Sequence, residues 1–380
     1  MFQGGVALLG RARGTLVPPL RLVWQCSLPV KDPGRIEAGP LIIGNRVLLA
    51  DTSGNVCCLD LATHQLVWNF VAPDAIFGTP LVTGGSGGGG AGGGRVFVGD
   101  QIGNLIALEL ATGNKLWQVD VGGPMHAAIS GLPPLTSTGT ELLLVPNDLG
   151  HLDARHPTDG KLVWQATLPS RINSAPAQAH GILYVGGCDS MLHALNAADG
   201  TERWSYALPG VVPGSPIVPE NDSASAKVVA AKRIVVGTDQ GELTCVDETG
   251  KLVWVYKDIG EHAMIFATPA AAQDVDHETT IIIGTRDHRV HGVDLATGKR
   301  RWVFDTAGEI DSPPLVSGAV VYVAGKDSRL YALATASGKE LWRFNLQNSV
   351  AAPLAIGGAG GGTLIVADNT GTVYCFQEHR

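Results

Sequence analysis

The amino-acid sequence predicts an all-β protein, an eight-bladed β-propeller of four-stranded antiparallel blades, and three observations lead to this fold. All eight tryptophans occupy the same position of a recurring phrase, which is best developed in Gly292–Trp302 (GVDLATGKRRW). The spacing from Trp24 to Trp342 is 318 residues over seven intervals, or about 45 residues per repeat, which is the length of a four-stranded blade. The 50 glycines and 22 prolines supply the tight turns that many short strands require.

The recurring phrase predicts one β-hairpin in each repeat. Two alternating apolar runs flank a turn such as Ala296–Lys299, in which Gly298 can take the positive φ that a tight turn needs. The tryptophan stands on the second run, which we expect to be the outermost strand. The tryptophans of this column are Trp24, Trp68, Trp117, Trp164, Trp204, Trp254, Trp302 and Trp342.

Two further short runs in each repeat predict the inner half of a blade. The innermost run carries small residues and, in every repeat but one, a proline, which is tolerated where strands crowd round a channel and lack a ladder partner. A second apolar run such as Val47–Ala50 follows it. The resulting blades cover approximately residues 36–70, 76–119, 125–166, 172–206, 212–256, 265–304, 310–344 and 350–377 plus 20–28.

The two ends of the chain complement each other. Leu20–Leu28 has the tryptophan strand without a hairpin partner, and Gly371–Arg380 has the partner without a tryptophan. We therefore expect the N-terminal strand to complete the last blade and close the ring, which removes exposed strand edges. Residues 20–380 then form one domain behind a flexible tail, residues 1–19.

Several segments are expected to carry no chemistry. The stretch Thr83–Gly94 (TGGSGGGGAGGG) predicts a mobile loop because it has no apolar area to bury. The tail has no clear signal peptide, although it contains arginine and lacks acids, so an organelle transit peptide is the alternative to a disordered tail. No segment is long and apolar enough to cross a bilayer.

Charge and cysteine usage narrow the expected partners and compartment. A net charge of −8 with only 16% charged residues gives no reason to expect nucleic acid. Most of the six cysteines, such as Cys58, Cys245 and Cys375, stand where other repeats have alanine or glycine, so we interpret them as small buried hydrophobic residues. Free thiols in this number favour a reducing compartment, and the cytoplasm is therefore preferred to a periplasm or an organelle.

One face of the predicted ring is the candidate binding site. The loops that lead from each outermost strand to the next blade and the turns between the second and third strands must emerge on this same face. The loop positions are Glu37, Phe77, His126, Asn173, Pro213, Phe266, Asp311 and Val350, and the turn positions are Asp51, Asp100, Asn147, Asp148, Asp189, Asp239, Asp287, Asp327 and Asp368. Such a ring could bind a basic peptide, a sugar or a cation.

The alternative is that these Asp and Asn side chains only form turns, by hydrogen bonds to nearby backbone. The histidines show no metal-ligand spacing, and no nucleophile elbow, P-loop or dinucleotide fingerprint occurs. The sequence therefore predicts neither a metal site nor catalytic residues.

The phrase in Gly292–Trp302, with a small residue, a hydrophobic residue, an acid, Ala-Thr-Gly-Lys and then tryptophan, resembles the repeat of the PQQ-like, or quinoprotein-type, β-propeller family. The resemblance covers about residues 20–377. It implies that the tryptophans dock between neighbouring blades and are structural. A WD40 propeller is disfavoured because no aspartate follows any of the tryptophans.

This family includes both dehydrogenases and non-catalytic propellers. Its dehydrogenases cover the quinone with a ring of two adjacent cysteines, stack it on a tryptophan and hold calcium beside it. Here Cys57 and Cys58 lie inside a predicted strand, where neighbours point to opposite faces, and every tryptophan belongs to the repeat column. We therefore expect a non-enzymatic scaffold without a cofactor; PQQ and calcium belong only to the alternative, a PQQ-dependent oxidoreductase.

The expected partner is a protein or peptide held at one face of a monomeric ring, and a small ligand at the channel mouth is a further expectation. A second alternative is the propeller lipoprotein of outer-membrane barrel assembly, which the chain resembles in size and blade number. Against it, Cys26 follows Val23–Gln25 rather than a small-residue lipidation box. The chain is also similar to the propeller that ends some aminoadipate-type adenylate-forming enzymes, which would make it a released module.

Overall fold

The computed structural model describes residues 10–12, 14–84, 93–136, 139–219, 232–260, 263–274, 278–358 and 362–379. Most of the glycine-rich stretch Thr83–Gly94, predicted to be a mobile loop, lies outside these ranges, as do residues 1–9 of the predicted tail. Among the described residues, no helix is long and apolar enough to span a membrane.

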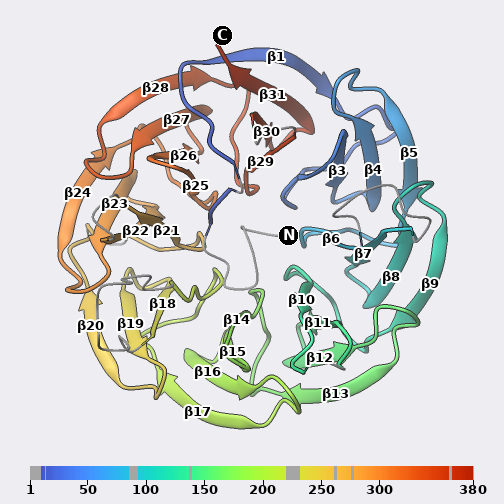
Figure 1. The fold of residues 1–380 in the computed structure, drawn as a ribbon, viewed down its shortest axis with the longest axis horizontal. Helices are drawn as coiled ribbons and strands as arrows, with labels where there is room; N and C mark the ends of the chain where they lie inside the picture. Colours follow the sequence, from blue (N-terminus) through green and yellow to red (C-terminus); the bar gives the residue numbers. More distant parts are fainter. Residues whose placement is uncertain are drawn as a thin grey trace.

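The described residues form eight antiparallel sheets that radiate from a central channel (Figure 1). The predicted eight-bladed, all-β propeller is therefore confirmed. We number the blades 1 to 8 in chain order, beginning with the sheet β2-β3-β4-β5. In each blade the chain runs from the channel to the rim, so that consecutive strands are neighbours, and only the last blade takes its outermost strand from the other end of the chain.

The inner half of a blade consists of its first and second strands, counted from the channel. The innermost strands are β2 (Leu41–Ile43), β6 (Leu81–Thr83), β10 (Ser130–Leu132), β14 (Ala177–Ala179), β21 (Ala270–Gln273), β25 (Leu315–Ser317) and β29 (Ala355–Gly357). The second strands are β3 (Arg46–Ala50), β7 (Arg95–Gly99), β11 (Leu142–Pro146), β15 (Ile182–Gly186), β18 (Arg233–Gly237), β22 (Thr279–Thr285), β26 (Val320–Ala324) and β30 (Thr363–Ala367).

The outer half of blades 1 to 7 is the predicted hairpin, and in blade 8 the two ends of the chain supply the corresponding pair of strands. The third strands are β4 (Asn55–Asp60), β8 (Asn104–Glu109), β12 (His151–Arg155), β16 (Met191–Asn196), β19 (Leu243–Asp247), β23 (Arg289–Asp294), β27 (Arg329–Ala334) and β31 (Thr372–Glu378). The outermost strands are β5 (Leu66–Val71), β9 (Lys115–Asp120), β13 (Leu162–Thr167), β17 (Glu202–Ala207), β20 (Leu252–Tyr256), β24 (Arg300–Asp305), β28 (Glu340–Asn345) and β1 (Leu20–Ser27).

Blade 5 departs from the predicted four strands at its inner edge. Its innermost segment makes one antiparallel bridge, between Ile217 and Val235, and the described sheet has three strands. Pro216 and Pro219 flank Ile217, and proline has no N–H to donate to a longer ladder.

The ring closes as the sequence predicts. Strand β1 pairs antiparallel with β31, from Leu20 opposite Glu378 to Ser27 opposite Thr372. The outermost strand of blade 8 thus comes from the N-terminal end of the chain, and its neighbour comes from the C-terminal end (Figure 1).

The tryptophans lie in the seams between successive blades. The ring of Trp302 packs on Gly338 of blade 7, where an added Cβ would lie 2.5 Å from the ring, and its Nε1 donates to the carbonyl oxygen of Thr335 at 2.8 Å. Gly298 has a φ of 70° and lies in the same way under Trp254 of blade 5. The turn glycine is therefore required twice, by its backbone conformation and by the ring of the preceding blade.

The other tryptophans follow this arrangement with local variations. Trp164 packs on Gly200, and Trp24 meets His64 in place of a glycine, with ring centroids 5.5 Å apart. Trp342 packs against Phe376 of blade 8, at 6.0 Å between centroids. Five further Nε1 donors reach backbone oxygens of the next blade at 2.8–3.3 Å, from Trp24, Trp68, Trp117, Trp204 and Trp254. Nε1 of Trp164 is buried without a partner among the described residues.

The described part of the predicted tail contacts blades 7 and 8. Residues 10–12 and 14–19, which we call the strap, run from the channel to β1 (Figure 1). Ala12 N donates to Val316 O and Val316 N to Gly10 O, both at 2.7 Å, so the strap begins beside β25 of blade 7. Leu16 is 0% exposed, and its carbonyl oxygen accepts the hydroxyl of Tyr322. Leu16 is buried between blades 7 and 8, and this burial favours attachment of the strap to the ring.

Candidate binding face of the ring

One face of the ring carries the loops that connect blades and the turns between second and third strands, and we call it the loop face. The loop from blade 1 to blade 2 is hydrogen-bonded to the turns of both blades: Ile76 N donates to Asp51 O at 3.2 Å, and Gln101 N donates to Ala75 O at 3.0 Å. The same pair of contacts recurs around the ring, for example from Met125 N to Asp100 O and from Asp148 N to Pro124 O. The loop face is therefore a rigid platform.

The first residue of several turns is a buried acid or amide that holds the turn together. Asp100 is 0% exposed; its Oδ1 accepts from the N–H groups of Ile102 and Asn104, and its Oδ2 accepts from Nδ2 of Asn104. The carboxylates of Asp51 and Asp368 and the amide of Asn147 accept from their own turns in the same way. These contacts support the turn interpretation for this subset of the predicted positions.

We expect Asp100→Ala to destabilise the protein by about 1–3 kcal/mol, because it leaves the partly buried donors of the turn without a charged acceptor. Chemical denaturation measures this change. Ser53→Ala, at an exposed turn position of blade 1, is the control and should change stability by less than about 0.5 kcal/mol. An Asp100→Ala protein of unchanged stability would show that the carboxylate is not a turn residue.

The other predicted acids are more accessible and have mixed partners. Asp287 accepts from Gly260 N at 3.1 Å, and Asp327 accepts from Ala307 N at 3.1 Å. Asp239 accepts the side-chain amide of Gln240, whereas Glu37 is exposed. Asn173 Nδ2 lies 2.8 Å from Sγ of Cys188. The structure does not gather these residues into a common site.

A first group of predicted residues does come together on blades 2 to 4. Nδ1 of His126 lies 2.8 Å from Oδ2 of Asp148, and Nη2 of Arg171 lies 3.4 Å from the same oxygen. The ring of Phe77 lies 5.0 Å from that of His126, between centroids, and Nε2 of Gln101 lies 2.9 Å from Nε2 of His126. An aromatic side chain, an imidazole and an arginine therefore share one area of the loop face.

A second group lies on blades 6 and 7. The guanidinium of Arg286 stands 3.5 Å from the centroid of the Phe266 ring and pairs with Asp311 at 2.8 Å. Lys326 lies 3.0 Å from the other oxygen of Asp311. Burial opposes ionisation of Asp311, but the hydrogen bonds from Arg286 and Lys326 outweigh it and lower the pKa of this carboxyl group. Glu309 pairs with both Arg286 and Lys326, so two cations face two carboxylates and the group is a structural ion-pair network.

Sequence reasoning missed two residues beside the first group. Ile102 and Leu149 occupy the third position of their turns and are 57% and 56% exposed. The same position is polar in the other blades, where it holds Ser53, Asp189, Gln240, Asp287, Asp327 and Thr370. Alignment of the turns could have found them, because an exposed turn normally carries a polar residue. We call Phe77, Ile102, His126 and Leu149 the apolar patch.

Cys57 and Cys58 do not fit the quinone-covering ring of two cysteines that the resemblance suggested. Cys57 packs in the seam between blades 8 and 1 with Trp24, and Cys58 packs in the next seam with Trp68. Burial raises the pKa of the Cys57 thiol to about 12. The two sulfurs thus face opposite sides of β4 and cannot cover a cofactor together. Within the described ranges, no three or more His, Cys, Asp or Glu side chains converge to hold a metal ion.

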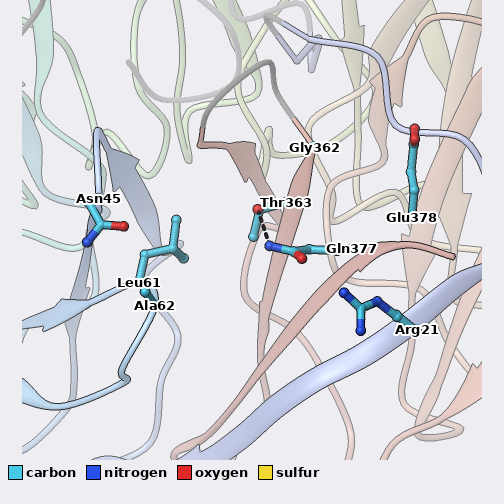
Figure 2. A pocket seen from close by; sticks show the side chains of 8 residues that line it. All are labelled: Arg21, Asn45, Leu61, Ala62, Gly362, Thr363, Gln377 and Glu378. Atoms are coloured by element: carbon cyan, nitrogen blue, oxygen red, sulfur yellow. Dashed lines mark hydrogen bonds between the residues drawn. The ribbon is translucent and has the colours of Figure 1, made fainter. Parts of the chain in front are cut away.

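The opposite face of the ring has a cavity of about 370 Å³ at the seam where the ring closes. Figure 2 shows Asn45, Leu61 and Ala62 of blade 1 on one side and Thr363 and Gln377 of blade 8 on the other. Blade 1 has Arg46 where blade 8 has Thr363, and the Arg46 guanidinium reaches the backbone oxygens of Leu110 and Ala111 in blade 2. Threonine is too short for this contact, so the cavity stays open.

Comparison with known proteins identifies the family. The family model described as "Outer membrane protein assembly factor BamB" matches residues 20–175, 148–302 and 268–374, which together cover most of the chain. The chain belongs to this family. It is the PQQ-like repeat family that the phrase in Gly292–Trp302 resembles, so the sequence-based recognition is confirmed.

Relatives of this chain carry names for different functions. The BamB protein of Yersinia pestis is 28% identical over 164 residues, which are 42% of this chain and 40% of that protein. The tetrathionate hydrolase of Acidithiobacillus ferrooxidans is 22% identical over 352 residues, or 79% of this chain and 64% of that protein. The matched parts thus span less than two thirds of both relatives.

Solved structures of the same fold include a BamB protein and an alcohol dehydrogenase. BamB of Moraxella catarrhalis superposes with a TM-score of 0.72 at 19% identity, over 94% of this chain and 99% of that one. The quinohemoprotein alcohol dehydrogenase of Comamonas testosteroni superposes with a TM-score of 0.76 at 15% identity, over 99% of this chain and 80% of that one. At these identities the likeness concerns the fold.

The preference for the cytoplasm is wrong, because the family and several relatives of the chain are outer membrane protein assembly factors. The physical argument behind that preference also fails. Cys57, Cys58, Cys245 and Cys375 are buried at 0–1% exposure, so their reduced state reflects inaccessibility. Buried thiols in a rigid core are inert in any compartment.

Proposed function

We propose that this propeller is a non-enzymatic scaffold that binds a protein partner through the apolar patch on blades 2 and 3. The kinship with outer membrane protein assembly factors supports a role in which the ring holds another protein. The mismatch of Cys57 and Cys58 with a quinone-covering ring supports a function without redox chemistry.

The observation that carries the proposal is the exposure of Ile102 and Leu149 on adjacent turns of a rigid face. Each stands next to a residue that contacts His126: Gln101 precedes Ile102, and Asp148 precedes Leu149. Exposed aliphatic side chains beside an aromatic ring and an arginine form the kind of area in which a few residues supply most of the binding energy of a protein interface. The polar groups around the apolar patch would form the polar rim of this interface.

The proposal predicts that Ile102→Lys combined with Leu149→Lys abolishes capture of the partner. The side chains are exposed, so thermal stability should stay within the error of the wild type. The measurement compares the proteins that immobilised wild-type and variant rings retain from the source organism, identified by mass spectrometry.

The matched control is Ser53→Lys combined with Thr370→Lys, which places the same charges on the same turn position in blades 1 and 8. It should keep the partner that the patch variant loses. If both variants keep the same proteins, or both lose them, the apolar patch is not the binding surface.

A further inference from the structure

The third strands of blades 4 and 6 carry a histidine at the same position, and the two histidines differ in their partners. In the strand register, His193 lies opposite Ser205 of the tryptophan strand of blade 4. His291 lies opposite Val303 of the tryptophan strand of blade 6. Around His193, Nδ1 lies 2.6 Å from Glu202 and Nε2 lies 2.8 Å from Asp189. Both nitrogens of His193 therefore face carboxylates.

The corresponding contacts are missing at His291. Arg300 stands where blade 4 has Glu202, and Asp287, the counterpart of Asp189, accepts from Gly260 N and Arg289 instead. His291 is 1% exposed, and its Nε2 is buried without a hydrogen-bond partner among the described residues. A buried polar atom without a hydrogen-bond partner is unfavourable, so an external partner is expected.

The hydrogen bonds at Nδ1, on the other side of the His291 imidazole, determine whether Nε2 carries a proton. Tyr256 donates its hydroxyl proton to the carbonyl oxygen of Asp258 at 3.1 Å, so its oxygen is left to accept from Nδ1–H of His291 at 3.0 Å. Burial lowers the pKa of His291 to about 4, which keeps the imidazole neutral at neutral pH. Nε2 then carries a lone pair and needs a hydrogen-bond donor.

A pocket of about 320 Å³ adjoins His291 in the seam between blades 5 and 6. Two arginines and two aspartates line it: Arg289 pairs with Asp305 at 3.1 Å, and Arg300 pairs with Asp258 at 2.9 Å. These four charges sum to zero, so an anion or a cation alone meets as much repulsion as attraction. A ligand with both charges can pair with both kinds of side chain.

We propose that this pocket binds a small zwitterion of the amino-acid class, whose ammonium group donates to Nε2 of His291 and whose carboxylate binds Arg289 or Arg300. The pocket has room for a free amino acid. It lies across the ring from the apolar patch, since β20 and β24 are on the side opposite β6 to β11 in Figure 1. The site is therefore independent of the proposed protein interface.

The test titrates the full chain with glycine and follows the ring ¹⁵N signals of the histidines. We expect a saturable shift of the His291 signal and a raised melting temperature, because a ligand of the folded state stabilises it. Methylammonium and acetate, which each carry one of the two charges, should bind more weakly. A wild-type protein that shows no saturable response to glycine would overturn the proposal and leave bound water as the partner of Nε2.

Two variants test whether the response to glycine arises in the pocket beside His291. His291→Ile should abolish the glycine response and keep the fold, because Ile106 occupies the same position in blade 2. Arg300→Gln, at a half-exposed side chain, should weaken it severalfold without loss of stability. His193→Ile is the matched control: it should lower the melting temperature and keep the glycine response. Equal responses in the wild type and His291→Ile would place glycine elsewhere and refute the site.

Discussion

Deletion of residues 1–28 should open the ring and leave a protein that aggregates or melts at a sharply lower temperature. The deletion removes β1 and exposes the edge of β31, with which it pairs along its whole length. It also removes the buried side chains of Leu16, Leu20, Trp24 and Leu28, each worth about 1.5–3 kcal/mol. The expected loss, about 6–12 kcal/mol, is comparable with the entire stability of a typical protein, about 5–15 kcal/mol.

Deletion of residues 1–9 alone is the control, because it leaves all of the contacts described for the strap and β1. A synthetic peptide of residues 10–28 should bind the truncated chain and recover part of its stability, since closure depends on noncovalent pairing. A soluble 29–380 fragment that melts at the wild-type temperature would show that β1 does not close the ring.

Replacement of Trp302 by alanine should destabilise the protein by about 3–5 kcal/mol, the usual cost of truncating a buried aromatic side chain. Trp302 is 6% exposed, packs on Gly338 and donates a hydrogen bond to Thr335 O, so truncation leaves a cavity and a carbonyl without its donor. Equilibrium denaturation in urea measures the change.

Leu341→Ala is the control, because Leu341 lies on the outermost strand of the neighbouring blade but is largely exposed. It should change the free energy of unfolding by less than about 0.5 kcal/mol. A loss below about 1 kcal/mol for Trp302→Ala would mean that the seam is loosely packed and that the tryptophan column does not hold the blades together.

The repeat made the fold predictable from the sequence, because a local hairpin with a fixed tryptophan constrains both the strand order and the neighbours of each blade. Closure by β1 followed from the incomplete repeats at the two ends. Features that depend on one position were harder to predict. The reduced inner edge of blade 5 depends on two prolines, and the attachment of the strap depends on the fit of Leu16 between two blades.

The candidate site was only partly predictable for the same reason. Topology placed the loop face correctly but gave all of its acids the same weight, although Asp100 is buried in its own turn and Asp148 is held by His126 and Arg171. Ile102 and Leu149 were missed because the search favoured polar chemistry. The contrast between His193 and His291 needs the identity of the residues across the strand and in the next blade, which hydrophobic patterning does not reveal.

The seam between blades 7 and 8 is packed differently from its neighbours, and this difference bears on where the ring opens first. Blade 8 has no turn between its third and outermost strands, so Trp342 meets Phe376 instead of a turn glycine. The strap inserts Leu16 into the same hydrophobic cluster and so adds buried apolar contacts to a seam that lacks the glycine contact. Release of the strap would thus be the first step of opening, and amide hydrogens of β1 and β31 should exchange before those of the opposite blades.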